Sequence, residues 1–278
     1  MRQLLIRTMD ARPLALARIA VGISSLPIAL ESLFPMLDVA SGDYLVLPVF
    51  NGSPPLTSIG VWALFAVSVT ASVAMILGIA GRLPAILVSA CAATALLSDQ
   101  QLYSNHLLLL VMLSALLGLS GAAKAIRSVE LNRTAQVPYW PAFLIKAQIT
   151  TLYAWTAIAK INPQYLSGEV VGSNLREWVP VGIDLLPAVS VLSIAAEAFL
   201  AVALWVPFTR ALGFLVGSGL HIGILVCLVN PAPLIPFALL MLSGYVLFAH
   251  DSLERGHWKK PTLTLRARER ASTLVRTD

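Results

Sequence analysis

Long apolar segments recur along almost the whole chain, and they constrain its fold more than any other feature. Each is close to the roughly 20 residues that a helix needs to cross a bilayer. Between them no stretch is long enough to fold as a separate aqueous domain. Because 58% of the residues are hydrophobic and only 12% are charged, the composition excludes an ordinary soluble domain. The sequence therefore predicts an all-α, polytopic integral membrane protein.

Eight transmembrane helices are expected, and the charges that flank them indicate one orientation. Arg2, Arg7 and Arg12 precede the first helix, whereas the next connection has acidic residues and neither lysine nor arginine. Since positive charge marks the cytoplasmic side, both termini are expected in the cytoplasm. The expected location is the plasma or inner membrane of the cell. The expected helices cover residues 13–36, 58–81, 83–98, 101–123, 141–161, 188–207, 209–231 and 232–250.

This pattern predicts one membrane domain over residues 1–250 and a basic cytoplasmic tail over residues 251–278. The net charge of +5 comes mainly from the N-terminal segment, short loops and this tail. The placement of these positive charges indicates the orientation of the helices in the membrane, so nucleic acid is not an expected partner. Cys91 and Cys227 lie in separate apolar segments, without metal-ligand spacing, and no metal site is predicted.

Lys160 lies near the end of the fifth expected helix, inside an apolar segment. An ammonium in hydrocarbon costs about 2.5–3.5 kcal/mol on insertion scales, so such a lysine usually has a partner or a function. Tyr153, Thr156 and Lys160 recur at steps of three and four, which places them on one helix face toward the bundle interior. Lys146 shares that face near the cytoplasmic end, where snorkelling to the surface explains it.

Other polar residues are expected at a similar depth on neighbouring helices. Asn105 and His106 open the fourth expected helix from the same side as Lys160, while Glu197 and His221 lie midway along the sixth and seventh. Four ionisable side chains on four helices predict one shared polar pocket that faces outward.

Such a pocket suits proton transfer to or from a lipid-soluble molecule. Burial disfavours the ammonium form, so a buried lysine can act as a base, and a histidine can relay the proton. A nearby Glu197 would favour the ammonium again. The distance between Glu197 and Lys160 therefore decides whether the lysine is a base or half of an ion pair. An apolar pocket favours a quinol over a sugar or a nucleotide.

These polar positions belong to longer segments that occur in one order. They are PLALARIAVG (13–22), SDQQLYSNHLLLL (98–110), AQVPYWPAFLIKAQ (135–148) and LYAWTAIAKINPQYLSG (152–168), followed by the surroundings of His221. Together they resemble the membrane region of vitamin K-dependent gamma-glutamyl carboxylase and the wider HTTM-domain proteins, over most of residues 10–250.

The resemblance implies an enzyme that deprotonates a reduced naphthoquinone, either vitamin K or menaquinone hydroquinone. Oxygen then converts the quinol to an epoxide, and the base so generated lets carbon dioxide add to a glutamate. By motif position Lys160 is the quinol-deprotonating lysine, and Asn105 and His106 line the quinone site. His221 falls where the family has a further histidine. The implied partners are the lipid bilayer, the quinone and a secreted peptide or protein substrate.

Two departures from the animal carboxylases bear on carboxylation. The printed chain extends about 28 residues beyond the last expected helix, whereas those enzymes have a large substrate-binding domain there. Ala159 stands where the family often has a second lysine before the motif lysine. Both departures place glutamate carboxylation in question more than quinol chemistry.

We further expect Tyr153, Thr156, Tyr165 and Glu197 to contact the substrate. The enzyme hypothesis requires Asn105, His106 and Lys160 to converge on one cavity wide enough for a fused bicyclic ring, and separate packing interfaces would contradict it. The alternative is a non-catalytic membrane scaffold or maturation factor for a secreted protein or peptide, in which Lys160 simply pairs with Glu197. A transporter is less favoured, because no inverted repeat is visible.

Overall fold

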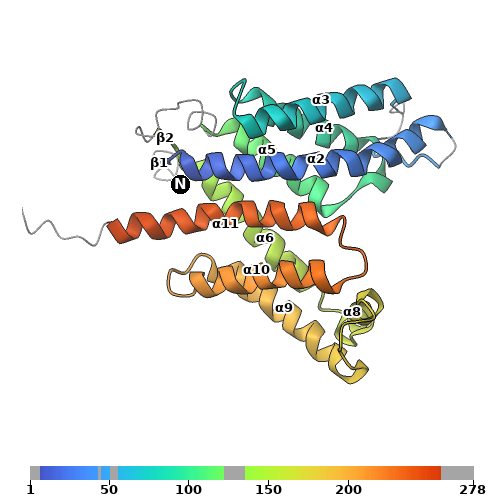
Figure 1. Cartoon of the computed structure of the whole chain (residues 1–278), viewed down its shortest axis with the longest axis vertical. Coiled ribbons are helices and arrows are strands. Elements are labelled where there is room, and N and C mark those ends of the chain that lie inside the picture. Colours follow the sequence, from blue (N-terminus) through green and yellow to red (C-terminus); the bar gives the residue numbers. More distant parts are fainter. Residues whose placement is uncertain (1–6, 43–44, 51–55, 122–134, 258–278) are drawn as a thin grey trace, which may run out of the picture.

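The structure, a computed structural model, describes residues 7–42, 45–50, 56–121 and 135–257 and is predominantly helical (Figure 1). Each of the eight segments expected to span the membrane contains a helix. These helices are α2 (Arg12–Ser41), α3 (Ser58–Leu77), α4 (Leu83–Ser98), α5 (Asn105–Leu119), α6 (Trp140–Ala159), α9 (Leu186–Ala203), α10 (Arg210–Cys227) and α11 (Leu234–His257).

The remaining elements are short. Strands β1 (Thr8–Asp10) and β2 (Gln136–Pro138) pair antiparallel at the start of α2 and α6. Short helical pieces connect the long helices, and they are η1 (Gln100–Leu102), α7 (Pro163–Leu166), α8 (Glu169–Asn174) and η3 (Ile183–Leu185). The long connection before α9 is thus partly helical, which supplies a wall for the cavity described below.

Local sequence signals explain where several helices begin and end. Thr57 caps the start of α3 by accepting a hydrogen bond from the Gly60 amide at 3.2 Å, and Ser104 does the same for α5 through the Leu107 amide. A side-chain oxygen at this position satisfies one of the amides that a helix start leaves without an intrahelical partner. At the other end of α3, Gly78 adopts the left-handed conformation that closes a helix.

Four of the helical segments are long and apolar enough to cross a membrane. They are Arg12–Ser41, Ser58–Leu77, Ile183–Ala203 and Arg210–Cys227. Three further apolar helices are shorter, and they are Leu83–Ser98, Asn105–Leu119 and Leu234–Ala249. Since a helix rises about 1.5 Å per residue, the first four, of 18 to 30 residues, are long enough to cover most or all of a hydrocarbon core about 30 Å thick. The arrangement indicates a membrane protein.

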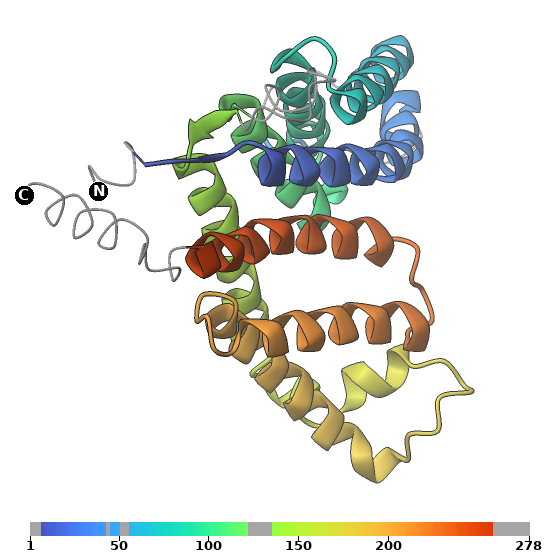
Figure 2. The same cartoon turned by 60° about the vertical axis from the view of Figure 1, so that its left-hand side comes forward.

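Two groups of helices are joined by α6 and α11 (Figures 1 and 2). The first group comprises α2 to α5, in which α2 packs against α3 and α4 against α5. The second comprises α9 and α10 with the short α7 and α8. Between the groups, α6 contacts α5, α11 and α9, and α11 contacts α2, α5, α6 and α10. The described start of the chain at β1 and the end of α11 lie at the same end of the molecule (Figure 2).

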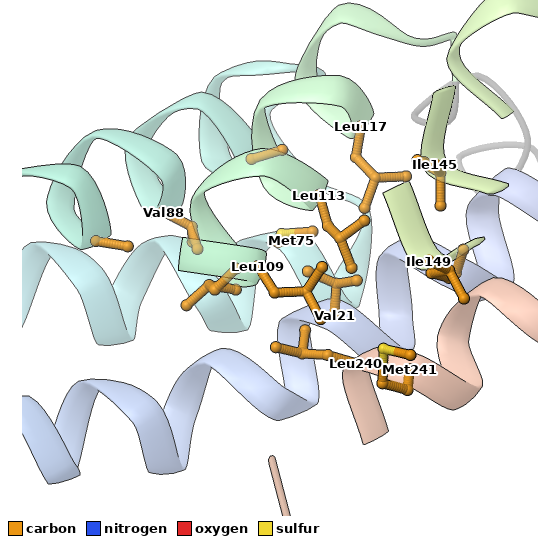
Figure 3. Close-up of a cluster of buried hydrophobic side chains, with 14 of the residues drawn as sticks. Val21, Met75, Val88, Leu109, Leu113, Leu117, Ile145, Ile149, Leu240 and Met241 are labelled. Carbon is orange, nitrogen blue, oxygen red and sulfur yellow. The ribbon is translucent and has the colours of Figure 1, made fainter. Parts of the chain in front are cut away.

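The main hydrophobic core lies where α5 meets both joining helices (Figure 3). Leu109, Leu113 and Leu117 recur at intervals of four along α5 and are at most 3% exposed. They lie with Ile149 of α6 and Met241 of α11, both of which are fully buried. Close packing at this junction fixes the angle of α6, and α6 carries Lys160 at its end.

Several helix ends differ from the expected ones: α2 continues to Ser41 instead of ending at residue 36, and α10 ends at Cys227 instead of residue 231. Residues 101–102 belong to η1, so α5 begins at Asn105, where Ser104 caps it. The last helix continues to His257, past the predicted boundary between residues 250 and 251. Residues 258–278 of the predicted tail lie outside the described residues.

The structure corrects the expectation that Lys146 snorkels to the surface. Its side chain is fully buried, and its ammonium donates a hydrogen bond to the Tyr139 hydroxyl at 2.6 Å. The same ammonium lies 4.8 Å from the Tyr139 ring centroid and 5.5 Å from the ring centroids of Trp205 and Phe248. Aromatic faces stabilise a desolvated cation, so this lysine is held inside the protein at the centre of a ring cluster.

Replacing Tyr139 with phenylalanine is expected to lower the free energy of unfolding by about 1–3 kcal/mol, because a buried charged donor loses its hydroxyl acceptor. Unfolding in detergent, followed by the loss of helical circular dichroism, measures the change. Tyr103→Phe is the matched control, since Tyr103 is 58% exposed, and it should change stability by less than about 0.5 kcal/mol. Equal stability of both variants would contradict this account of Lys146.

Candidate functional site

Lys160 lies at the point where α6 stops, and the following sequence causes that stop. Pro163 disfavours the helical conformation at the residue before it, and Asn162 is extended, with φ −144° and ψ 157°. The Asn162 side chain then accepts a hydrogen bond from the Tyr165 amide at 2.9 Å and starts α7. The chain turns sharply here, and Tyr165 comes to lie beside the Lys160 side chain.

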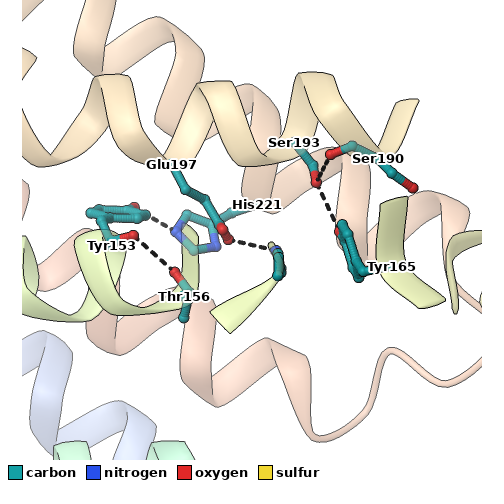
Figure 4. Close-up of polar contacts among 8 residues, drawn as sticks. Tyr153, Thr156, Tyr165, Ser190, Ser193, Glu197 and His221 are labelled. Atoms are coloured by element: carbon teal, nitrogen blue, oxygen red, sulfur yellow. Dashed lines mark hydrogen bonds and ion pairs between the residues drawn. The ribbon is translucent and has the colours of Figure 1, made fainter. Parts of the chain in front are cut away.

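The Lys160 ammonium forms an ion pair with Glu197 of α9. Its Nζ lies 2.7 Å from Glu197 Oε1, and the side chains of Lys160 and Glu197 are 25% and 8% exposed. The ammonium also lies 5.3 Å from the centroid of the Tyr165 ring. The Tyr165 hydroxyl is in turn hydrogen-bonded to Ser193 Oγ at 2.8 Å (Figure 4). By its distance to Glu197, Lys160 is half of an ion pair.

A cavity of about 620 Å³ opens beside this ion pair. Its polar wall includes Lys160, Tyr165 and Ser193, and most of the other lining side chains are aliphatic. The aliphatic part comes from α8, the following loop, α9 and α10, and it includes Val170, Val171, Leu175, Val179, Val181, Val189, Leu192, Val216, Leu220, Ile224 and Leu228. Cavities of about 300–1,000 Å³ with an apolar lining and few polar groups are typical of small-molecule sites.

The four glycines of α10 divide into two pairs with different roles. A Cβ at Gly213 would press on Leu204, and one at Gly217 would overlap the Tyr245 hydroxyl. Gly219 and Gly223 instead line the cavity, and a Cβ at either would meet no atom within 4 Å. Close helix packing, the usual role of small residues in membrane helices, holds for the first pair. The second pair keeps the cavity wide.

His221 lies in a buried chain of hydrogen bonds that crosses three helices. Its Nε2 is 2.9 Å from the Tyr153 hydroxyl, which is 2.7 Å from the Tyr245 hydroxyl. All three residues are at most 7% exposed. Thr156 donates from Oγ1 to the Tyr153 carbonyl oxygen at 3.1 Å. Tyr153, Thr156, Glu197 and His221 are not among the lining residues of the cavity. Tyr153 contacts His221 and Tyr245 instead.

Asn105 and His106 lie apart from the Lys160 cavity, which corrects the expectation of one shared pocket. His106 Nε2 lies 2.9 Å from Glu31 Oε2 of α2. Asn105 is exposed, and its Oδ1 accepts a hydrogen bond from the Tyr103 hydroxyl at 3.2 Å. The reason lies in the helix arrangement, since α5 packs on α4 and α2 in the other group of helices. The required convergence of these two residues with Lys160 is therefore not observed, which contradicts the enzyme hypothesis in the form that places Asn105 and His106 at the quinone site.

Tyr245 is the site residue that sequence reasoning missed. It is a tyrosine within the last apolar helix, and a buried tyrosine hydroxyl usually finds a hydrogen-bond partner. That signal predicts some partner, but it does not identify Tyr153, which is 92 residues earlier in the chain.

The arrangement combines an apolar cavity with one charged side chain at its wall, that of Lys160, which is paired with the buried carboxylate of Glu197. In a medium of low dielectric constant the Lys160 ammonium strongly attracts an oxygen that carries negative charge. Glu197 can accept a proton that Lys160 releases, because their atoms are in hydrogen-bond contact. Among the described residues, no group of three histidine, cysteine or acidic side chains is placed to hold a metal ion.

Comparison with known families identifies one match over most of the chain. The family model described as HTTM domain matches residues 6–250. Neither the curated proteins nor the solved structures contain a match to this sequence.

Proposed function

Because this chain belongs to the HTTM-domain family, we propose that it is a membrane enzyme that binds a reduced naphthoquinone beside Lys160 and removes a proton from it. The HTTM domain occurs in vitamin K-dependent carboxylase-like proteins. The observation that carries the proposal is the apolar cavity with Lys160 at its wall, where Lys160 is ion-paired to Glu197 behind the lining.

The cavity fits a naphthoquinone in size and in chemistry. Its 620 Å³ accommodates a fused bicyclic ring, and its aliphatic lining suits an apolar molecule better than a sugar or nucleotide. A quinol has few polar atoms, and the cavity wall has few polar groups to match them. Lys160 and the Tyr165–Ser193 pair would hold a quinol oxygen, while Val216, Leu220 and Ile224 of α10 would contact the ring.

The proton step starts from the ion pair, in which Lys160 is already an ammonium, so Lys160 can act as a base only by passing a proton to Glu197. Lys160 Nζ accepts the proton of the bound hydroxyl as it passes one of its own protons to Glu197 Oε1, 2.7 Å away. Lys160 remains an ammonium throughout and stays next to the new oxyanion, while the protonated Glu197 becomes neutral. The total charge of the buried site does not change. Net movement of charge into a low-dielectric site is thereby avoided.

A bound, deprotonated naphthoquinol would react with molecular oxygen, and that reaction would yield an epoxide and a strong base. The residues that the proposal needs are Lys160, Glu197 and Tyr165. Asn105 and His106, which the resemblance implies at the quinone site, have no role in it. The coupling to carbon dioxide and a peptide glutamate is a further step of the same proposal.

We also propose the topology of eight crossings, with both termini in the cytoplasm and the cavity facing outward from the plasma or inner membrane. The common position of β1 and the end of α11 supports it. Arginines at residues 2, 7 and 12 support the cytoplasmic side for this end.

Lys160→Met is expected to reduce epoxide formation at least about 100-fold, since a positioned general base contributes roughly 10²–10⁴-fold. Purified protein in nanodiscs, reduced menaquinone and oxygen are incubated, and the epoxide is quantified by mass spectrometry. Tyr103→Phe is the control, because that exposed side chain is outside the cavity. Equal rates for wild type and Lys160→Met would contradict the proposed base.

The second candidate function is a non-catalytic scaffold or maturation factor for a secreted protein or peptide. Two observations favour it. Lys160 is already paired with Glu197, and Asn105 and His106 do not reach the cavity. This candidate predicts that function survives when the ion pair is replaced by apolar residues, whereas the enzyme predicts its loss.

A further inference from the structure

The cavity beside Lys160 lies between two helices that separate along their length. Figures 1 and 2 show α9 and α10 spreading apart from their short connection. Near that connection the helices touch, because a Cβ at Gly213 would lie 3.2 Å from the Leu204 side chain. At the wide end α8 packs on the start of α9, where a Cβ at Gly172 would lie 2.7 Å from Leu186 Cδ1. The residues that follow α8 then cross from α9 to α10.

Residues 175–181 form a strap across this wide end, and hydrogen bonds tie it to the end of α10. The Arg176 amide donates to the Cys227 carbonyl at 2.9 Å, and Arg176 Nε donates to the Leu228 carbonyl at 2.8 Å. A third hydrogen bond, of 2.9 Å, joins the Val229 amide to the last residue of α8. The end of a helix leaves carbonyls without intrahelical partners, and a cation is favoured there. Arg176 therefore holds the strap on α10.

The strap has an apolar inner face and an exposed outer face. Leu175, Val179 and Val181 line the cavity, whereas Glu177 and Trp178 are exposed. Tryptophan is enriched where a membrane meets water, and a glutamate is costly in hydrocarbon. These two side chains place the strap at the membrane surface, between the cavity and the water.

The cavity also reaches the surface of the protein further along both helices. Leu192 of α9 and Gly219 of α10 line it and are exposed, Leu192 by 69%. Gly219 precedes Cys227 by eight residues, which is about 12 Å along a helix, so this opening lies at hydrocarbon depth. Apolar side chains on the exposed faces of α10 flank it, and they include Leu215 and Ile222. Surface of this composition contacts lipid in a membrane protein.

We propose that the ligand enters this cavity from the lipid, between α9 and α10 past Leu192 and Gly219, while the strap held by Arg176 excludes water-soluble molecules. The inference rests on the proposed function for the chemistry of the ligand, a naphthoquinol, and adds its route and form. The ligand is dissolved in the bilayer and carries an apolar tail, which extends through the opening and need not fit inside the 620 Å³. Arg176 does not line the cavity and is a positioning residue that acts through the strap.

Cys227 reports on the strap, because it lines the cavity and the chain has one other cysteine, Cys91. In Cys91→Ala protein in nanodiscs, Cys227 is treated with a charged methanethiosulfonate or an apolar maleimide. Each rate is divided by the rate of the same reagent with glutathione. We expect the charged reagent to react at least about tenfold more slowly, since a charge is costly to move through hydrocarbon. Equal normalised rates would overturn the closed strap.

Removing the hydrogen bonds of Arg176 in steps should admit the charged reagent. Arg176→Ala removes the side-chain bond, and Arg176→Pro removes the amide bond as well. Leu175 has φ −75° and ψ 144°, which a following proline allows. The charged reagent should react roughly two- to tenfold faster for each lost hydrogen bond, and Glu177→Gln, a change at an exposed strap residue, should have no effect. Equal rates in all four proteins would contradict the role of Arg176.

Gly219→Phe tests the opening toward the lipid. A Cβ at Gly219 meets no atom within 4 Å, so the added ring has room to fill the opening, and the apolar maleimide should react with Cys227 at least about tenfold more slowly. Leu215→Phe is the matched control on the same helix, because Leu215 is 71% exposed and does not line the cavity. If Gly219→Phe reacts as fast as Leu215→Phe, the lateral route is wrong.

These labelling rates require no turnover, so they separate this inference from the proposed function. Slow charged labelling and fast apolar labelling, together with no epoxide from reduced menaquinone, would reject the quinol chemistry and leave the route. Epoxide formation together with fast charged labelling of wild type would reject the route and leave the chemistry.

Discussion

Replacing Gly223 with phenylalanine is expected to weaken naphthoquinone binding at least about 100-fold, which corresponds to roughly 2.7 kcal/mol. A Cβ at this position meets no atom within 4 Å, and the ring that follows it must enter the cavity that Gly223 lines. The helix itself should tolerate the change, because glycine in a helix interior costs about 1 kcal/mol relative to alanine. Binding should therefore be lost from a folded protein.

Photoaffinity labelling with an azido-naphthoquinone measures this effect. In wild type, mass spectrometry should find the label on peptides of α9 and α10, and competition by unmodified menaquinone should remove it. Leu215→Phe is the matched control, because it adds an aromatic ring to the same helix at a side chain that is 71% exposed. If Gly223→Phe is labelled as strongly as Leu215→Phe, the quinone does not bind in this cavity.

The second large effect concerns stability. Glu197→Leu is expected to lower the free energy of unfolding by about 3 kcal/mol, because it leaves the Lys160 ammonium without its carboxylate partner. This value is the low end of the usual range for breaking a buried ion pair, because the Lys160 side chain is still 25% exposed to solvent. Adding Lys160→Met removes the unpaired charge, and the double variant should return to within about 1 kcal/mol of wild type.

A double-mutant cycle of detergent unfolding tests this prediction. Wild type, Lys160→Met, Glu197→Leu and the double variant are compared, and the coupling between the two positions should exceed about 1 kcal/mol. Additive changes would mean that the ion pair contributes nothing specific. They would also remove the basis for direct proton transfer between these two residues.

The positions of the helices could be predicted from the sequence because the signals for them are local. Apolar length sets the spans, and capping residues such as Thr57 and Ser104 set their starts. The end of α6 at Ala159 is equally local, because Pro163 follows a few residues later and disfavours a helical conformation at the residue before it. The expected helix at residues 83–98 has the same bounds in the structure.

The partners of the polar residues could not be predicted because they depend on which helices meet. The sequence alone did not decide whether Lys160 is a free base or a member of an ion pair. The 2.7 Å distance to Glu197 shows that it is a member of an ion pair. His106 has the depth expected of a pocket residue, but Glu31 on α2 provides a nearer carboxylate. Lys146 has the position of a snorkelling lysine, yet aromatic rings from three parts of the chain enclose it.

Glycine spacing shows the same limit on a single helix. Gly213, Gly217, Gly219 and Gly223 all suggest close helix packing when only the sequence is considered. Two of them face neighbouring side chains and two face a cavity. The difference is set by α8 and the loop before α9, whose positions relative to α10 are not encoded in the α10 sequence.

Epoxide formation by the Lys160→Met/Glu197→Leu double variant is the measurement that tests the central claim most directly. This variant removes both proton-transfer groups and leaves no buried unpaired charge, so loss of activity cannot be assigned to unfolding once its stability matches wild type. If Lys160 and Glu197 act on a bound naphthoquinol, wild type forms the epoxide from reduced menaquinone and oxygen and the folded double variant does not. Equal epoxide formation by both proteins, or none by folded wild type, would contradict the account.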